Sequence, residues 1–257
     1  MRRFCVVLLI FLCGLAPAET VTHWSAGVTP DSGWHDFNKS FEKGEQGDSL
    51  LCWAAVASNL LAWWQQQNAA LVPPHAPQGE QIWQRFREVF ENEGGDPDQG
   101  IRWWFHGKYT AENPGEGMRV AAIRQSGSGG FLGESAPAVE QLLYCGREAG
   151  VTATSLTEAL LSGFRRGDAF WIGVSLLKPD GRRFMHSLNV WGIDVEDNRV
   201  RAVYMCDSDD ARSELHRIPV VEEEGMLWLD CGGHPLYGKI GRVVIDTYTG
   251  LRLVPAE

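Results

Sequence analysis

Residues 19–51 are rich in turn-forming residues, and apolar residues then recur at helical spacing in several runs between about residue 50 and residue 166. The clearest run extends from about residue 50 to 68, where one face carries Trp53, Val56, Ala57, Leu60, Leu61 and Trp64. Asp48 and Ser49 precede this run as candidates for the N-cap. The pattern therefore predicts an amphipathic helix that has Cys52 in its first turn.

Three more helices are predicted in the same part of the chain. One carries Trp83, Phe86, Val89 and Phe90 and stops at the Gly94-Gly95 pair. The other two are expected over residues 136–149 and 156–166. From about residue 169 the pattern changes to alternation, which predicts strands over residues 170–177, 183–195, 199–206, 225–230 and 239–247. Helices followed by strands indicate an α+β fold rather than a βαβ array.

The first eighteen residues have the features of a leader peptide. A short basic start at Arg2 and Arg3 leads into a hydrophobic run that is too short to span a bilayer, and residues 16–18 (Ala-Pro-Ala) fit a signal peptidase site. We expect residues 1–18 to be a signal peptide and the mature protein, residues 19–257, to be secreted or periplasmic. No later stretch is apolar enough to predict a membrane span.

The net charge of the chain restricts the kinds of molecule that it is expected to bind. The chain has 23 basic and 33 acidic residues, a net charge of −10, and loss of the two leader arginines makes it −12. Such a surface repels phosphate backbones, so nucleic acid is not an expected partner. The hydrophobic share of 44% and charged share of 22% are those of a globular protein and argue against disorder.

Four cysteines remain in the expected mature chain. An even number in an exported protein suggests two disulfides, but a catalytic thiol would leave room for one at most. We expect that bridge between Cys206 and Cys231, at the ends of strand-like runs, and Cys145 buried on a helix. The cysteines show neither CxxC spacing nor a histidine cluster, so no zinc or other cofactor is expected.

Cys52 is the candidate nucleophile, because the N-terminus of a helix favours a thiolate. The alternative is an inert buried cysteine. Among the seven histidines, His186 differs in opening an apolar strand-like segment. A regular hairpin around residues 196–198 places it opposite about position 208, beside Asp207 and Asp209. A carboxylate there can orient the imidazole for general acid and base catalysis.

Two side chains ahead of Cys52 are candidates to stabilise an oxyanion. Lys39 and Gln46 both precede the nucleophile closely, and each could equally be a solvated loop residue. The acidic run from residue 207 to 210 also has a calcium-loop reading, but it lacks the glycine that an EF-hand loop places at its centre. No metal is therefore expected at the site.

The chain resembles the IdeS/Mac family of secreted immunoglobulin-degrading cysteine endopeptidases, within the papain-like superfamily. The resemblance lies in residues 26–30 (AGVTP), 33–41 (GWHDFNKSF), 50–55 (LLCWAA) continuing to residues 62–64 and 68, 186–192 (HSLNVWG), 202–204 (AVY) and 207–210 (DSDD). These segments are a minority of the chain but contain every candidate catalytic position.

The resemblance implies a role for each matched residue. Cys52 corresponds to the nucleophile, His186 to the general base and acid, and Asp207 to the orienting carboxylate. Lys39 corresponds to the lysine of the oxyanion hole, and Asp209 to a second acidic residue that supports the site. The implied fold is papain-like, with a helical lobe over about residues 45–168 and a β-rich lobe over about 169–257. Gln46 precedes Cys52 by six positions as in papain itself, so it is the alternative oxyanion donor.

The expected function is hydrolysis of peptide bonds in a protein substrate, with immunoglobulin as the candidate. A transglutaminase-like or amidase activity can use the same three residue types and is the nearest alternative. A non-catalytic module that engages a host protein or glycan through its tryptophans is the alternative of another class. The eleven tryptophans are otherwise expected in the core.

Overall fold

The structure is a computed structural model. It describes residues 19–44, 47–110, 120–124, 128–133, 136–147, 151–177, 183–234, 238–239 and 241–254. The expected signal peptide, residues 1–18, and the candidate oxyanion donor Gln46 both lie outside the described residues. Within the described part of the chain, no helix is both long and apolar enough to cross a membrane.

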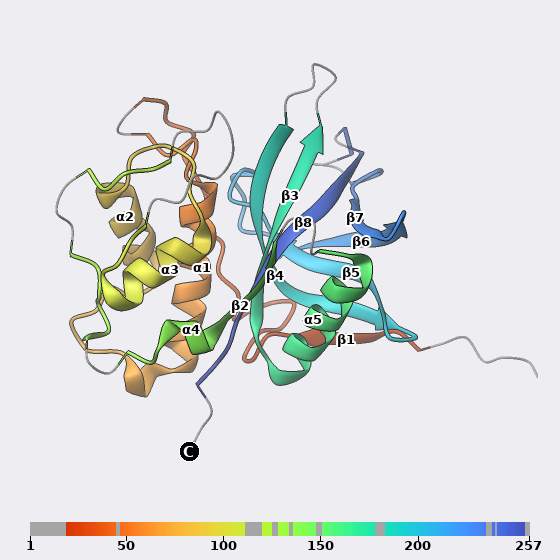
Figure 1. The fold of residues 1–257 in the computed structure, drawn as a ribbon, viewed down its shortest axis with the longest axis horizontal. Coiled ribbons are helices and arrows are strands. Elements are labelled where there is room, and N and C mark those ends of the chain that lie inside the picture. Colours follow the sequence, from red (N-terminus) through yellow and green to blue (C-terminus); the bar gives the residue numbers. More distant parts are fainter. Residues whose placement is uncertain are drawn as a thin grey trace, which may run out of the picture.

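Helices gather on one side of the molecule and strands on the other (Figure 1). The helical side contains α1 (Cys52–Gln67), the short 3-10 helix η1 (Ala69–Leu71), α2 (Glu80–Val89), α3 (Pro97–His106) and α4 (Val139–Leu142). Helix α5 (Ala153–Arg166) lies instead against the strands. Its start is fixed by a capping box in which Thr152 and Ser155 bond each other's backbone N–H groups.

The strands form an antiparallel barrel. The described strands are β1 (Val21–Trp24), β2 (Leu143–Arg147), β3 (Ala169–Leu177), β4 (Arg183–Glu196), β5 (Arg199–Cys206), β6 (His216–Glu223), β7 (Met226–Asp230) and β8 (Arg242–Leu251). Six of them pair in the order β4-β3-β8-β7-β6-β5, and β5 returns to β4, which closes the sheet. Strand β1 adds to β4, and β2 pairs with β8.

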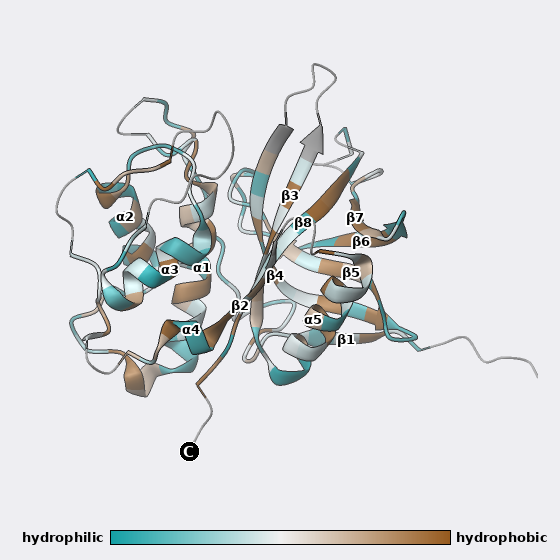
Figure 2. Cartoon of the chain, in the orientation of Figure 1, coloured by the Kyte–Doolittle hydropathy of each residue, from teal (hydrophilic) through white to brown (hydrophobic). Residues whose placement is uncertain are grey.

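Alternation along β4 divides the molecule into two cores. Leu188 and Val190 belong to the apolar cluster inside the barrel and under α5. Trp191 belongs to the second cluster, which lies between the barrel and the helices. Successive side chains of a strand point to opposite faces, so one strand supplies both cores. Apolar residues, brown in Figure 2, accordingly occur along the barrel strands and on the neighbouring helices.

The mixed α+β class is confirmed, as are the helices expected over residues 50–68 and 156–166 and the five expected strands. Eight of the eleven tryptophans are buried, which confirms their expected place in the core. The division into a helical lobe at about 45–168 and a β-rich lobe at about 169–257 stays a prediction.

Several expected elements are wrong. The helix expected over residues 136–149 is only α4, because the chain then turns into β2 and pairs with β8. Cys145 is therefore exposed on a strand, not buried on a helix. Helix α2 ends at Val89, before the Gly94-Gly95 pair. The sequence pattern did not predict β1, β2, β6 or α3. Strands β1 and β2 are too short to show a period, but β6 alternates in burial and α3 is amphipathic, so the sequence did carry a signal for these two.

Candidate functional site

Cys52 is the first residue of helix α1. The N-cap residue is Leu51, and no side chain caps the helix. Asp48 and Ser49 are therefore not the cap: the Asp48 carboxylate accepts hydrogen bonds from Ser40, and the Ser49 carbonyl accepts one from Lys39. An uncapped N-terminus leaves backbone N–H groups and the positive end of the helix dipole available beside the sulfur.

His186 and Asp207 meet beyond the paired part of the β4–β5 hairpin. The β4–β5 ladder starts at Glu196 opposite Arg199, whereas a turn at residues 196–198 would pair residue 195 with residue 199. Paired numbers therefore sum to 395 at both ends of the ladder instead of 394, because the two irregularities between them shift the register in opposite directions and cancel. The expected neighbours nevertheless come together, because His186 Nε2 lies 2.6 Å from Asp207 Oδ1. Asp207 Oδ1 also accepts the backbone N–H of Asp209 at 2.9 Å.

Cys52 and His186 are hydrogen-bonded to each other, and each shifts the pKa of the other. Burial acts to raise the pKa of the Cys52 thiol, but the His186 hydrogen bond and the charges of His186 and Lys39 leave it lowered. Burial acts to lower the pKa of His186, but Asp207 and Cys52 together raise it well above its usual value. These opposite shifts both favour the thiolate–imidazolium form of the pair.

The backbone of Ser187 adds to this effect, since its hydrogen bond to the Cys52 sulfur also lowers the thiol pKa. Because Nε2 of His186 faces Asp207, Nδ1 is the ring nitrogen left for Cys52. The three groups thus form a line of thiol, imidazole and carboxylate. Neighbouring polar groups orient each of them.

Lys39 and Asp209 form an ion pair beside this line. Lys39 Nζ lies 2.6 Å from Asp209 Oδ1 and donates to the Ser49 carbonyl at 2.9 Å. The lysine side chain is 3% exposed, so little solvent screens its charge from Cys52. Asp209 Oδ1 also lies 3.9 Å from His186 Nε2. The structure thus brings together five of the six candidate residues, and Gln46 is the one that lies outside the described part.

The same groups are the one described cluster with the ligand types of a metal site. His186, Asp207 and Asp209 offer ligand atoms within 4.8 Å of one another. The Lys39 ammonium already neutralises Asp209, and His186 is the proton-bearing partner of Asp207. The donor set therefore fits an acid–base site better than a divalent cation site, which would have to displace both partners.

Sequence reasoning missed a second acidic group behind the site. Burial, with help from Asp210 and Asp207, raises the pKa of the Asp36 carboxyl to about 8. Asp210 in turn pairs with the buried His216, whose Nε2 lies 2.6 Å away. Asp36 lies in a turn-rich segment without periodicity, so no sequence pattern indicated that it would be buried there.

The four cysteines of the described residues are all free. The expected bridge between Cys206 and Cys231 is therefore wrong. The Cys206 sulfur accepts a hydrogen bond from Trp191 Nε1 at 2.9 Å and donates one to the His35 carbonyl at 3.2 Å. These partners hold the thiol in the core between the barrel and α1, where it acts as a small buried residue.

Two buried asparagines join the helix of the nucleophile to the strand of the histidine. Asn59 Nδ2 of α1 donates to Asn189 Oδ1 of β4 at 2.9 Å, and Asn189 Nδ2 donates to the Val56 carbonyl at 3.2 Å. Asn59 Oδ1 also accepts the backbone N–H of Phe37 at 2.8 Å. This pair of asparagines fixes the position of α1 along β4, and hence the position of Cys52 relative to His186.

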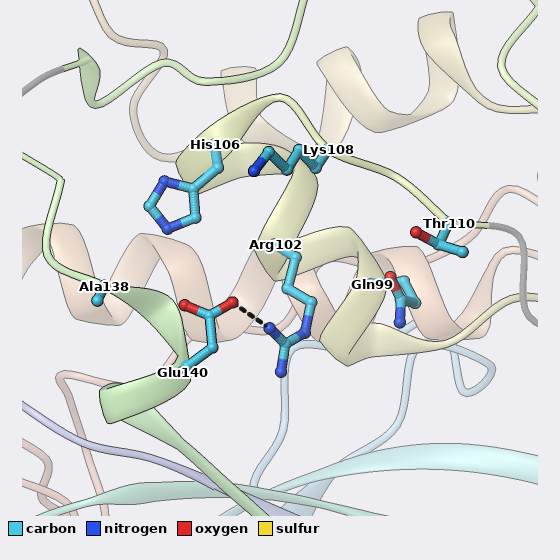
Figure 3. A pocket seen from close by; sticks show the side chains of 7 residues that line it. All are labelled: Gln99, Arg102, His106, Lys108, Thr110, Ala138 and Glu140. Carbon is cyan, nitrogen blue, oxygen red and sulfur yellow. Dashed lines mark hydrogen bonds and ion pairs between the residues drawn. The ribbon is translucent and has the colours of Figure 1, made fainter.

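A cavity of about 500 Å³ lies away from these residues, between α3 and α4 (Figure 3). Arg102 crosses it to bond Glu140 at 2.7 Å, and His106 and Lys108 lie on its rim. The cavity contains none of the candidate site residues, so the sequence-predicted chemistry does not lie there.

Fold and site define an α+β protein with a thiol, an imidazole and a carboxylate lined up where a helix N-terminus meets an antiparallel barrel. The family model described as Mac 1 matches residues 16–85, the segment that contains Lys39 and Cys52. This match confirms the resemblance to the IdeS/Mac family that the sequence motifs indicate. No curated protein matches the chain.

Proposed function

We propose that the chain is an exported cysteine endopeptidase that hydrolyses peptide bonds of a protein substrate through Cys52, His186 and Asp207. The observation that carries the proposal is the position of His186, which bonds Cys52 on one side and Asp207 at 2.6 Å on the other. The Mac 1 match over the nucleophile segment supports the same function. Immunoglobulin is the candidate substrate that the family suggests.

Each step of the reaction has a group to perform it. The Cys52 thiolate attacks the carbonyl carbon of the scissile bond, and the backbone N–H of Cys52 with Lys39 or Gln46 stabilises the oxyanion. Protonated His186 gives its proton to the amine as the C–N bond breaks. Neutral His186 then takes a proton from water, which attacks the acyl-enzyme and releases Cys52 as the thiolate.

The arrangement of elements supports a papain-like fold for this enzyme. The nucleophile is the first residue of a helix on the helical side, the histidine lies on β4, and the aspartate directly follows the neighbouring strand β5. Cys52 is partly exposed at this junction, so a substrate peptide can reach its sulfur. Export follows from the leader-like residues 1–18 and is a separate part of the proposal.

The test compares the wild type with Cys52→Ala by mass spectrometry of the products from immunoglobulins and from a mixture of other proteins. The wild type is expected to produce new termini that the variant does not. Cys52 is partly exposed and is the first residue of α1, so its replacement by alanine removes little packing. The circular dichroism spectrum of the variant is therefore expected to match that of the wild type. Cleavage by the Cys52→Ala protein would rule out the assigned nucleophile.

The alternative activities predict other products. Addition of a primary amine would yield amine-labelled glutamine residues with a transglutaminase, whereas an endopeptidase yields new N-termini. A binding module predicts that iodoacetamide alkylates Cys52 no faster than an ordinary thiol at pH 7. The proposed enzyme requires fast alkylation, because its thiol is already ionised.

A further inference from the structure

A second imidazole–carboxylate pair lies behind the candidate site. His216 Nε2 lies 2.6 Å from Asp210 Oδ2, the same separation as between His186 and Asp207. The side chains of His216 and Asp210 are 6% and 3% exposed, and the reaction proposed above uses neither of them. A buried pair of this kind adds little net stability, because desolvation of the two groups opposes their attraction. Its place in the fold indicates a different role.

Asp210 belongs to the turn that carries the two acidic residues of the site. Its backbone N–H donates to the Asp207 carbonyl at 3.2 Å, and the N–H of Asp209 donates to Asp207 Oδ1 at 2.9 Å. Asp210 Oδ1 accepts the backbone N–H of Arg212 at 2.8 Å, while Oδ2 faces His216. Both carboxylate oxygens are engaged, and the Asp210 side chain therefore links the turn to the strand of His216.

The barrel holds His216 in place. This residue is the first of β6 and pairs with Met205 of β5, two residues before Asp207. The His234 ring packs edge-on against the His216 ring, with the two centroids 5.1 Å apart. Strand pairing fixes the backbone and the aromatic neighbour restricts the ring, so His216 is a fixed donor for Asp210.

The other side of the turn is joined to the segment of the candidate oxyanion lysine. The Lys39 backbone N–H donates to the Ser208 carbonyl at 2.9 Å, and Asn38 Nδ2 donates to the Arg212 carbonyl at 2.8 Å. The turn is thus held between this segment and β6. Since His216 holds it from the β6 side, loss of that bond would let the acidic residues of the site move relative to the imidazole that they orient.

Charge favours a basic partner for Asp210 as well. The acidic residues of the site each have one, and Asp210 has His216. Asp36 lies close to them and has no basic partner among the described residues, and burial, followed by Asp210 and Asp207, raises its pKa to about 8. Without His216, Asp210 would be a second buried acid that lacks a partner, and it would repel Asp207.

We propose that His216 is a positioning residue of the candidate site. By holding Asp210, it fixes the turn that keeps Asp207 against His186. The inference rests on the proposed peptidase function and adds a residue that neither the sequence pattern nor the family resemblance assigns. His216 contacts no substrate; its effect reaches Cys52 through the carboxylate that stabilises the imidazolium.

The experiment compares the wild type with His216→Leu and His216→Gln by steady-state kinetics on a cleaved peptide. Leucine fills most of the space but donates no hydrogen bond, whereas the glutamine amide can still donate to Asp210. His216→Leu should lower kcat about tenfold or more with little change in KM, because the imidazole of the site is less well oriented. His216→Gln should recover most of that loss.

The pH at which Cys52 becomes reactive is a readout that a purely structural role would not change. The rate of alkylation by iodoacetamide, followed by mass spectrometry of the Cys52 peptide, reports the thiolate. A displaced Asp207 stabilises the His186 imidazolium less. The half-maximal rate should therefore shift to higher pH in His216→Leu and stay near the wild-type value in His216→Gln.

Two further variants separate positioning from stability. His216→Leu alone leaves Asp210 buried without its partner, so a double variant that adds Asp210→Leu replaces both groups with apolar ones and is expected to regain stability in urea unfolding. It should nevertheless keep the low kcat and the shifted alkylation. Val220→Ala, four residues further along β6, should lower the free energy of unfolding and leave kcat unchanged.

The outcomes distinguish this inference from the proposed function. Fast alkylation of wild-type Cys52 together with an unchanged kcat and alkylation profile in His216→Leu would overturn the positioning role and leave the peptidase intact. If His216→Leu does not fold, the double variant decides: wild-type activity there would assign the pair to stability alone and overturn the inference. Slow alkylation of Cys52 in the wild type would instead overturn the peptidase, and the positioning role with it.

Discussion

Asp207 shows how one carboxylate organises the site at the scale of single residues. Its Oδ1 accepts both His186 Nε2 and the backbone N–H of Asp209, and its side chain is 6% exposed. The backbone N–H of Asp209 therefore holds this oxygen in place independently of the imidazole. A buried carboxylate held in this way sets the tautomer of neutral His186 and stabilises its protonated form.

Asp207→Asn should lower kcat by about 100-fold or more, with a much smaller change in KM. The amide keeps the shape of the side chain but loses the charge that orients and stabilises the imidazolium. Steady-state kinetics on a cleaved peptide measure the split. An equal loss in Asp31→Asn, which changes an exposed aspartate far along the chain, would argue against a specific effect.

The rate of cleavage should depend on pH as a broad bell. Because the pKa of Cys52 is lowered, its thiolate persists at pH values below 9.0, the ordinary pKa of a thiol. Activity falls when acid protonates the thiolate. Because the pKa of His186 is raised, its imidazolium persists at pH values above 6.5, the ordinary pKa of histidine. Activity falls when base removes that proton. Measurements of kcat/KM against pH test this, and Asp207→Asn should move the alkaline limb to lower pH. Activity that only begins near pH 9 would contradict the ion pair.

Asp36 should make the fold less stable as pH rises. Between 3.8 and about 8 the folded chain keeps a proton on Asp36 that the unfolded chain has released. The free energy of unfolding therefore falls as pH increases through this range. Asp36→Asn should remove that part of the slope in urea unfolding at pH 5 to 8, whereas Asp31→Asn should retain it. An unchanged slope in Asp36→Asn would contradict the raised pKa.

At the scale of elements, the decisive contact is the one between α1 and β4. Helix α1 brings the thiol and β4 brings the imidazole, and they derive from segments more than a hundred residues apart in sequence. The buried pair of Asn59 and Asn189 joins them with directional hydrogen bonds rather than with apolar packing alone. The register of the two elements, and with it the distance between the thiol and the imidazole, depends on that pair.

Asn189→Ala should lower the free energy of unfolding by about 1–3 kcal/mol, because Asn59 Nδ2 then loses its partner in a buried position. It should also slow the alkylation of Cys52 by iodoacetamide, since the thiol and imidazole are no longer held in register. Urea unfolding and intact mass measure the two effects. Gln66→Ala, an exposed change on the same helix, should alter neither.

At the scale of the whole molecule, no disulfide joins the described parts of the chain. The barrel closes through hydrogen bonds from β4 round to β5, and two apolar clusters hold its inside and its contact with the helices. A chain of this length has core enough to be stable without crosslinks. Cys145 is then an accessible surface thiol, and Cys206 and Cys231 are buried thiols.

Alkylation of the denatured protein, residues 19–257, should add four groups per chain without any reductant. The melting temperature should be the same with and without a reducing agent. Incorporation of two groups that rises to four after reduction would show a bridge and contradict the structure. A Cys145→Ser variant, which should add three, controls for oxidation between chains.

The sequence by itself determined the elements with long periodic runs and the identities of the candidate site residues. The helix over about residues 50–68, the strands around His186 and the hairpin that brings Asp207 near it all follow from local spacing and turn chemistry. Those features depend on neighbours along the chain, so they can be deduced without the fold.

Tertiary structure decided the rest. Residues 143–147 form a strand because β8 offers a pairing edge, and the N-cap candidates Asp48 and Ser49 are engaged by other segments. Closure of the barrel, burial of Asp36 and the free state of Cys206 depend on which distant segments meet. Desolvation and long-range pairing act between residues far apart in the chain, and no local pattern records them.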